Sequence, residues 1–225
     1  MKFDIAIIGS GPGGYVAAIR ASQLGKKVAI IERENLGGIC LNWGCIPTKA
    51  LLKSAQVFDY INHSDDYGIS IKDAKVDFDG MVKRSRGVAD GMSKGIAFLM
   101  KKNKIEVING TGKLAGKGKI NVTDDKGKNS TVEADHIILA TGARSRELPN
   151  IPIDGKNVVG YRDAMVLPKQ PKEMIVIGSG AIGMEFAYFY STIGTKVTIV
   201  EFMDRILPVE DVDVSKAMMM NYKKK

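Results

Sequence analysis

The sequence predicts an α/β fold in which two similar strand–helix–strand units carry parallel strands. Residues 3–8 and 174–177 are short runs that are apolar at nearly every position, which is the pattern of a strand buried on both faces of a parallel sheet. A glycine-rich turn, a helix-like stretch and a second apolar run that ends at a glutamate follow each of these strands. This order is typical of a βαβ unit.

The two units can be followed element by element. The first has a strand at 3–8, a glycine turn at 9–14, a helix at 15–24 and a strand at 28–31 that ends at Glu32; the second has them at 174–177, 178–183, 184–193 and 197–200, ending at Glu201. From the first glycine to the glutamate the offset is 169 residues, and 11 of the 24 positions of 9–32 are identical to those of 178–201 without a gap. Two copies in one register predict two Rossmann-like dinucleotide-binding units more strongly than a single glycine motif would.

The residue types in each turn suit a dinucleotide. In such a turn the first glycine permits a tight bend, the second lets the backbone approach a pyrophosphate, and the third lets helix and strand pack closely. The helix N-terminus adds free N–H groups for the phosphates. The glycines at these positions are Gly9, Gly11 and Gly14 in the first copy and Gly178, Gly180 and Gly183 in the second. Glu32 and Glu201 suit a ribose hydroxyl, and a carboxylate at position 201 favours NAD over NADP. The alternative is a pair of glycine turns that bind nothing.

The only two cysteines lie between the first unit and a long helical stretch. Four residues separate Cys40 from Cys45. Pro47 predicts a helix that starts near Cys45 with proline in its first turn, and cysteines so placed can come within disulfide distance. A helix N-terminus and Lys49 favour a reactive thiolate. The alternatives are a zinc site, a structural disulfide and two inert buried thiols; for zinc, His63 and His136 lack paired-ligand spacing.

Composition excludes several function classes. The chain has 33 basic and 25 acidic residues, a net charge of +8. The lysines are scattered and not interleaved with aromatic residues, which indicates a solvated surface and no nucleic-acid partner. No apolar run is long enough to span a membrane, and no secretory signal follows Met1. We therefore expect a cytoplasmic protein with no membrane partner and no metal.

The rest of the chain predicts ordinary elements. Helices are expected at 47–62 and about 78–102 around a loop at 64–77, a β-meander at 104–123 and 130–135 with a turn at 124–127, and an amphipathic helix at 211–225. A proline-rich connection joins the two halves. The predicted domains are a dinucleotide-binding domain with the dithiol at 1–145, a connection at 146–172 and the first part of a second such domain at 173–225.

Segment 37–49, Gly-Gly-Ile-Cys-Leu-Asn-Trp-Gly-Cys-Ile-Pro-Thr-Lys, resembles the redox-active site of the pyridine nucleotide–disulfide oxidoreductases. Further segments share the resemblance: the two glycine turns with Glu32 and Glu185, then 110–112, 140–143 and 201–208. The resemblance covers essentially the whole chain. It implies a Rossmann-like FAD-binding domain with a β-meander, followed by the start of a Rossmann-like NAD-binding domain.

The resemblance also implies roles for individual residues. Cys40 would exchange with a dihydrolipoyl substrate, and Cys45 would lie against the flavin as a thiolate. Lys49 would sit near the flavin, paired with Glu185. Gly112, Thr141 and Gly142 would contact FAD. Electrons would pass from the dihydrolipoyl group to the disulfide and through FAD to NAD+.

The substrate implied is a dihydrolipoyl group on a carrier domain of a 2-oxoacid dehydrogenase or glycine-cleavage complex. Glutathione or mercuric reductase types are the alternatives within the family, and a non-catalytic FAD-binding fragment or a flavin-independent thiol exchanger are the alternatives outside it. The chain resembles only the N-terminal half of enzymes that are homodimers with a catalytic histidine in a later domain. We therefore expect no steady-state turnover from these 225 residues alone.

Overall fold

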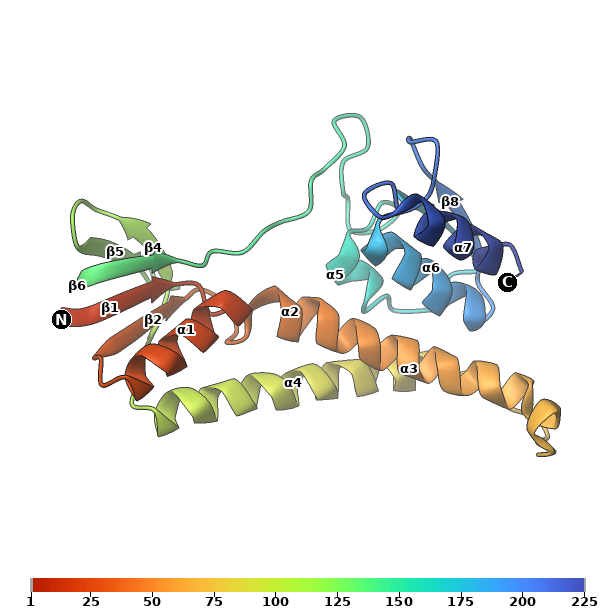
Figure 1. The fold of residues 1–225 in the computed structure, drawn as a ribbon, viewed down its shortest axis with the longest axis horizontal. Coiled ribbons are helices and arrows are strands. Elements are labelled where there is room, and N and C mark those ends of the chain that lie inside the picture. The colour runs from red at the N-terminus through yellow and green to blue at the C-terminus, as the bar shows by residue number, and fades with distance from the viewer. Residues whose placement is uncertain (1, 225) are drawn as a thin grey trace. The chain divides into compact units, whose positions relative to one another are not determined.

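The computed structural model describes residues 2–224, which form two compact units. The first unit comprises the chain up to Pro47 and Arg86–Asn150, and the second comprises Thr48–Ser85 and the chain from Ile151 onwards. In chain order (Figure 1) the elements are β1 (Lys2–Ile8), α1 (Pro12–Gln23), β2 (Val28–Glu32), α2 (Gly38–Trp43), α3 (Cys45–Asn62), the 3₁₀ turn η1 (Ser64–Tyr67), α4 (Phe78–Lys102), β3 (Glu106–Asn109), β4 (Thr111–Leu114), β5 (Lys119–Thr123), β6 (Asn129–Leu139), α5 (Tyr161–Ala164), β7 (Glu173–Ile177), α6 (Ala181–Thr192), β8 (Lys196–Val200) and α7 (Val212–Tyr222).

The first unit is built on one six-stranded sheet, in the order β3-β2-β1-β6-β5-β4. The strands β3, β2, β1 and β6 are parallel, whereas β5 and β4 run antiparallel to their neighbours. β6 is shared: its first half pairs with β5, and from Glu133 onwards it pairs with β1. One long strand therefore joins the parallel sheet to the meander.

Alternation along β1 and β2 decides what each face of the parallel sheet contacts. Successive side chains of a strand point to opposite faces. Ile7 and Ile30 point to the face covered by α1 and α4, where they pack with Ala18 and Met100. The opposite face of the same strands packs against the meander; its buried members are Phe3, Ala6, Ile8, Ala29 and Ile31 with Ile120, Val122, Val132 and Ala134. Both faces are buried, which explains the apolar runs in the sequence.

The second unit contains a parallel pair, β7 and β8, with Glu173 opposite Lys196 and Ile177 opposite Val200. α6 follows β7, and its buried Tyr190 donates a hydrogen bond from its hydroxyl to the Ala164 carbonyl at 2.6 Å. Burial raises the pKa of Tyr190, which therefore stays a neutral donor. A smaller cluster forms around Met184, Ile206 and Leu207.

The α/β fold class predicted from the sequence is confirmed, as are both βαβ units. The helices expected at 47–62, about 78–102 and 211–225 correspond to α3, α4 and α7, with ends that differ by a few residues, and residue 225 lies outside the described residues. Two local predictions were wrong, and one helix was not predicted. The residues 106–109 form a third parallel strand and not part of the meander. The residues 130–135, expected as the last strand of the meander, form only part of β6, which continues to Leu139 and also pairs with β1. Helix α2, which carries Cys40, was not predicted.

Among residues 2–224, no helix combines the length and the apolar character needed to cross a bilayer.

Candidate functional site

The first glycine turn joins β1 to α1 and leaves one side open. Gly9 has a φ of +101°, and Gly11 is the N-cap of α1. A side chain on Gly9 would collide with the Ala140 carbonyl, and one on Gly14 would collide with the Gly9 carbonyl. A side chain on Gly11, by contrast, would meet no atom within 4 Å. The turn is therefore closed toward β6 and open at the helix N-terminus, which fits a pyrophosphate.

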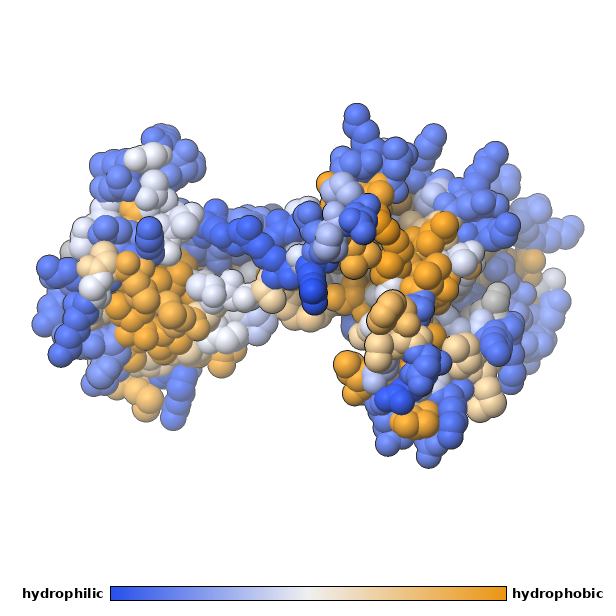
Figure 2. Space-filling model, turned by 90° about the horizontal axis from the view of Figure 1, so that it is seen from above, coloured by the Kyte–Doolittle hydropathy of each residue, from blue (hydrophilic) through white to orange (hydrophobic). Residues whose placement is uncertain are grey.

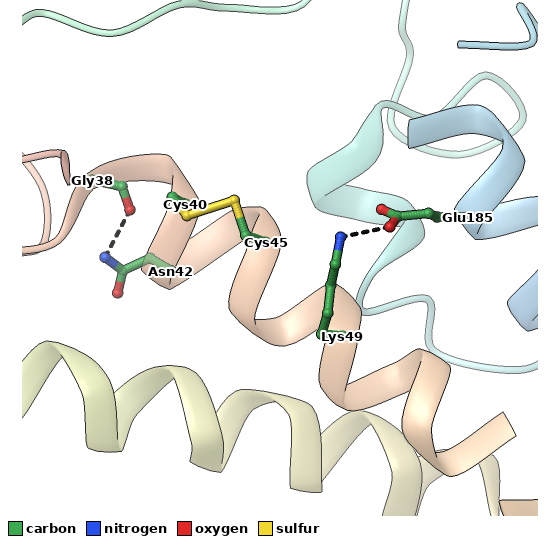
Figure 3. The surroundings of a disulfide bond; sticks show 6 residues. All are labelled: Gly38, Cys40, Asn42, Cys45, Lys49 and Glu185. Carbon is green, nitrogen blue, oxygen red and sulfur yellow. Dashed lines mark hydrogen bonds and ion pairs between the residues drawn. A yellow bond between two sulfur atoms is a disulfide. The ribbon is translucent and has the colours of Figure 1, made fainter. Parts of the chain in front are cut away.

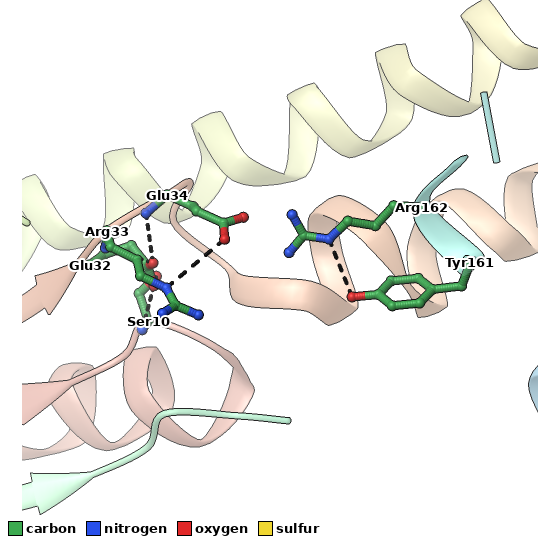
Figure 4. A network of polar contacts seen from close by, with 6 residues as sticks. All are labelled: Ser10, Glu32, Arg33, Glu34, Tyr161 and Arg162. Carbon is green, nitrogen blue, oxygen red and sulfur yellow. Dashed lines mark hydrogen bonds and ion pairs between the residues drawn. The ribbon is translucent and has the colours of Figure 1, made fainter. Parts of the chain in front are cut away.

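Glu32 ends β2 beside this turn (Figure 4). Its Oε2 accepts from the Ser10 backbone N–H at 2.9 Å and from the Ser10 hydroxyl at 2.6 Å. Its Oε1 accepts from the N–H groups of Arg33 and Glu34 at 2.8 and 2.9 Å. Ser10 itself is fully buried. These bonds fix the orientation of the Glu32 carboxylate at the edge of the turn.

The second turn repeats this geometry in the second unit. Gly178 has a φ of +96°, Gly180 is the N-cap of α6, and a side chain on Gly183 would collide with the Gly178 carbonyl. Glu201 accepts from the Ser179 N–H at 2.7 Å and hydroxyl at 2.6 Å, and from the Met203 N–H at 2.9 Å. The hydrogen bonds from Met203 and Ser179 lower the pKa of Glu201 to about 2. This carboxylate therefore stays ionised at neutral pH.

The two cysteines lie at the bend between α2 and α3 and form a disulfide (Figure 3). Their Cα atoms are 4.8 Å apart. Cys40 is half-buried within α2, and Cys45 is exposed as the first residue of the 18-residue helix α3. A thiolate at a helix N-terminus is stabilised by the free N–H groups and the helix dipole.

The segment that carries the disulfide begins against the first glycine turn. The Gly37 N–H donates to the Ser10 carbonyl at 3.0 Å. A side chain on Gly38 would lie 2.6 Å from the Gly11 Cα. This close backbone approach requires glycine, and it places the start of α2 directly beside the first glycine turn.

Lys49 and Glu185 form an ion pair in the second unit, between α3 and α6 (Figure 3). The Lys49 Nζ lies 2.5 Å from the Glu185 Oε1, and the two side chains are 62% and 29% exposed. Lys49 follows Cys45 by one helical turn on α3. The resemblance implied that Lys49 pairs with Glu185, and the structure contains this ion pair.

The remaining predicted flavin contacts lie at strand ends of the first unit. The Ala140 N–H donates to the Ile8 carbonyl at 2.9 Å, so Thr141 and Gly142 leave the sheet next to Gly9. Gly142 has a φ of +73° and open space around it. Gly112 differs from them. A side chain there would touch Ile8, Ile31 and Ile120, so packing also favours glycine at this position.

Within residues 2–224, no group of three or more His, Cys, Asp or Glu side chains is placed to hold a metal ion. His63 lies 2.8 Å through its Nδ1 from the Asp59 carbonyl, and His136 lies on β6.

Arg86 belongs to the surroundings of the disulfide but was missed by the sequence analysis. Its guanidinium lies 4.1 Å from the ring centroid of Trp43, a residue between the two cysteines. No spacing signal connects a residue on α4 with a residue of α2 that lies 43 positions earlier. Only the packing of α4 against α2 reveals it.

Comparison with known proteins agrees with this geometry. The family model described as "Pyridine nucleotide-disulphide oxidoreductase" matches residues 3–225. A dihydrolipoyl dehydrogenase of Zymomonas mobilis is 50% identical over 223 residues, which are 99% of this chain and 48% of that protein. One of Rhizobium etli is 52% identical over 95% of this chain and 48% of its own length, and the leghemoglobin reductase of Vigna unguiculata is 42% identical over 98% and 43%.

A solved structure, LpdA of Mycobacterium tuberculosis, superposes with a TM-score of 0.91 at 29% identity, and it is matched over 100% of this chain and 50% of that one. The chain thus spans about half the length of the curated relatives that it matches. The glycine turns, the paired cysteines beside the first of them and a family match across both units lead to one conclusion: the chain belongs to the pyridine nucleotide-disulphide oxidoreductase family.

Proposed function

We propose that this chain belongs to a flavoprotein that oxidises a protein-bound dihydrolipoyl group to its disulfide with NAD+, the activity of a dihydrolipoyl dehydrogenase. The observation that carries the proposal is the position of the Cys40–Cys45 disulfide, on a segment that begins against the first glycine turn. A redox dithiol has a use beside a nucleotide site only if the bound cofactor exchanges electrons with it.

FAD fits the first unit. Gly9, Gly11 and Gly14 would hold its pyrophosphate at the open N-terminus of α1, and Glu32 would hold its adenosine ribose. Thr141 and Gly142 would contact it where β6 ends, and Gly112 and Lys49 are proposed as further contacts. When bound, FAD supplies the two-electron relay between the dithiol and NAD+.

The thiol chemistry uses the two cysteines in turn. One dihydrolipoyl thiolate attacks the Cys40 sulfur, so that a mixed disulfide forms and Cys45 leaves as a thiolate. The second dihydrolipoyl thiol then attacks the substrate sulfur of that mixed disulfide and releases Cys40. Two electrons and two protons pass from the substrate to the protein. The position of Cys45 at the start of α3 stabilises the leaving thiolate.

NAD+ fits the second unit. Gly178, Gly180 and Gly183 would hold its pyrophosphate, Glu201 would accept from a ribose hydroxyl, and Glu185 on α6 would stand close by. A carboxylate that remains ionised at neutral pH repels a 2′-phosphate, which supports NAD+ over NADP+.

The proposal extends to partners and to domain organisation. The dihydrolipoyl group would be carried by a 2-oxoacid dehydrogenase or glycine-cleavage complex, and the full-length enzyme would be a homodimer. We place it in the cytoplasm, where the reducing environment makes a disulfide transient and suits a catalytic rather than a structural role. The domains proposed are 1–145 for FAD and 173–225 for the first part of the NAD site, with 146–172 as the connection.

A single-turnover experiment tests the proposal. The FAD-loaded protein is mixed anaerobically with dihydrolipoamide, and the long-wavelength absorbance of a thiolate–flavin complex is followed. We expect this band in the wild type and its loss in Cys45→Ser. A protein that binds FAD but never develops the band would be a non-catalytic nucleotide-binding fragment. Thiol exchange without any FAD binding would support a flavin-independent exchanger instead.

A further inference from the structure

One arginine of α4 holds the chain between the two cysteines. An Nη1 of Arg86 donates to the Asn42 carbonyl at 2.6 Å. The same guanidinium lies 4.1 Å from the ring centroid of Trp43, within the range of a cation–π contact. All three residues belong to the first unit. Asn42 and Trp43 are the last two residues of α2, directly before Gly44.

The break at Gly44 is what allows the disulfide to form. Five residues of uninterrupted helix advance about 7.5 Å along the axis, which exceeds the roughly 4.4–6.8 Å between the Cα atoms of a disulfide. Gly44 adopts φ −139° and ψ −119°, outside the helical region, and the Cα atoms of Cys40 and Cys45 are 4.8 Å apart. Fusion of α2 and α3 into one helix would separate the sulfurs.

Arg86 acts on the carbonyl that decides between these two geometries. In an uninterrupted helix the Asn42 carbonyl would accept from the N–H of residue 46. In the broken geometry it accepts from Arg86 on another helix. A charged donor makes a stronger hydrogen bond than a neutral one. Arg86 therefore favours the broken geometry over the continuous helix.

The contacts before the break are also specific. The buried Asn42 side chain donates from Nδ2 to the carbonyls of Leu36 and Gly38, both at 3.0 Å (Figure 3 shows the second). From α4, the Ser93 hydroxyl donates to the Leu36 carbonyl at 2.8 Å. Side-chain hydrogen bonds thus hold the chain at the start of α2, and the hydrogen bond from Arg86 holds its end.

The surroundings of Arg86 leave its charge in place. Partial burial lowers the pKa of the guanidinium, and Asp90, one turn further along α4, acts in the opposite direction. An arginine remains protonated under these conditions. The donor is therefore present at any pH at which the dithiol reacts.

We propose that Arg86, through Asn42 and Trp43, is a positioning residue of the Cys40–Cys45 couple that keeps the reduced thiols in bonding geometry. The inference deepens the proposed function, because it concerns the same dithiol. It makes the disulfide easier to re-form after reduction. Loss of the clamp lets the open form gain conformations that cannot close, which favours the dithiol.

The equilibrium with glutathione measures this directly. Two Cys thiols and one oxidised glutathione give the Cys40–Cys45 disulfide and two reduced glutathiones, so that two electrons and two protons pass to glutathione. The full chain has no other cysteine. After an acid quench and alkylation, intact mass therefore gives the fraction of disulfide. Neither NAD+ nor dihydrolipoamide takes part in this equilibrium. The role of Arg86 can therefore be tested even if the proposed dihydrolipoyl activity proves wrong.

We expect Arg86→Met to lower the equilibrium constant for disulfide formation about tenfold, which is about 30 mV. Trp43→Leu, which changes no charge, should shift it in the same direction, and Trp43→Phe should restore most of the wild-type value. The double variant Arg86→Met/Trp43→Leu should shift it by less than the product of the single effects, because both remove one clamp.

Arg84→Met is the matched control. Arg84 lies two residues earlier on α4, and its Nη1 donates to the Ala50 carbonyl at 2.7 Å, outside the segment between the cysteines. We expect it to shift the equilibrium by less than twofold. A shift below twofold in Arg86→Met, an equal shift in Arg84→Met, or independent effects of Arg86 and Trp43 would each overturn the proposal. Should Arg86→Met fail to fold, the Trp43 pair decides.

Discussion

The two βαβ units share a turn and differ in what surrounds it. In both, a buried serine donates its N–H and hydroxyl to the glutamate that ends the next strand. In both, the serine carbonyl accepts from the chain beyond that glutamate, from Gly37 in the first copy and from Leu207 in the second. The first copy is followed by α2 and α3, which carry the two cysteines, and the second copy is followed by α7. The glycine turn thus occurs twice with the same hydrogen bonds, and the disulfide lies beside only one of the two copies.

The sheet faces differ as well. Ile8 and Ile31 of the first copy are 7% and 1% exposed, because the meander covers them. Ile177 and Val200 occupy the equivalent positions and are 52% and 49% exposed. Figure 2 shows apolar surface in both regions of the molecule. The same pattern of apolar residues therefore gives a buried face in one copy and an open face in the other.

The largest effect is expected from a substitution that fills a glycine turn. Gly14→Val drives a side chain into the Gly9 carbonyl and Gly183→Val drives one into the Gly178 carbonyl, and overpacking of this kind costs about 1–3 kcal/mol or more. We expect Gly14→Val to lose FAD and Gly183→Val to retain it, as measured by flavin absorbance after gel filtration. Gly13→Ala, in open space, is the control. Equal flavin loss in both valine variants would contradict the assignment of FAD to the first turn alone.

The covered and open faces can be compared by one pair of substitutions. Ile8→Ala removes a buried side chain from the first unit and should lower the free energy of unfolding by about 2–5 kcal/mol. Ile177→Ala removes an exposed one and should change it by less than about 0.5 kcal/mol. Urea unfolding followed by circular dichroism measures both. A large cost for Ile177→Ala would show that this face is covered in solution.

Acid should reveal the hydrogen bonds of the second carboxylate. The pKa of Glu201 is lowered to about 2 in the folded state, whereas an unfolded glutamate titrates near ~4.3. The stabilisation is therefore complete above the unfolded value and is lost as the pH falls through about 2. Ser179→Ala removes one bond and should raise the pKa of Glu201, as read from the NMR titration of its side-chain carboxyl. An unchanged pKa would mean that the Ser179 hydroxyl contributes nothing.

The smallest effect is expected at a position where the copies differ in charge. Glu185 stands where the first copy has the exposed Val16, and it pairs with Lys49. Lys49 is exposed and Glu185 is only partly buried, so a double-mutant cycle of Lys49→Met and Glu185→Gln should give a coupling free energy of about 0.2–1 kcal/mol. A coupling of several kcal/mol would contradict a surface ion pair. The effect on flavin reduction, measured separately, would show whether the pair matters for chemistry.

Most of the fold followed from local patterns. Apolar runs and glycine turns predicted both βαβ units, because buried parallel strands and tight turns impose strong local requirements. Pro47 correctly predicted the start of α3. The strand 106–109 was misassigned, because its pairing with β2 depends on residues about 77 positions away. Helix α2 was missed, because six residues with two glycine neighbours carry no helical period.

The residues of the candidate site also fall into those that local sequence patterns predicted and those that only the structure revealed. The spacing of Cys40 and Cys45 predicted that they could bond, and the two glutamates were identified from their distance to the glycines. Arg86 was not, since a contact between α4 and α2 leaves no periodic signal in the chain. Gly112 was assigned to the cofactor from the resemblance, and the structure adds that a side chain there would also crowd Ile8 and Ile31.

The sequence by itself determined the repeated glycine turns, the acid after each and the spacing that lets the two thiols bond, because these depend on residue types within a short stretch of chain. Only the tertiary structure decided that α2 begins against the first glycine turn and that β6 joins the parallel sheet to the meander. It also decided that Arg86 donates to the Asn42 carbonyl beside the break at Gly44. These features arise from contacts between segments distant in the chain, and such contacts exist only once the elements have packed.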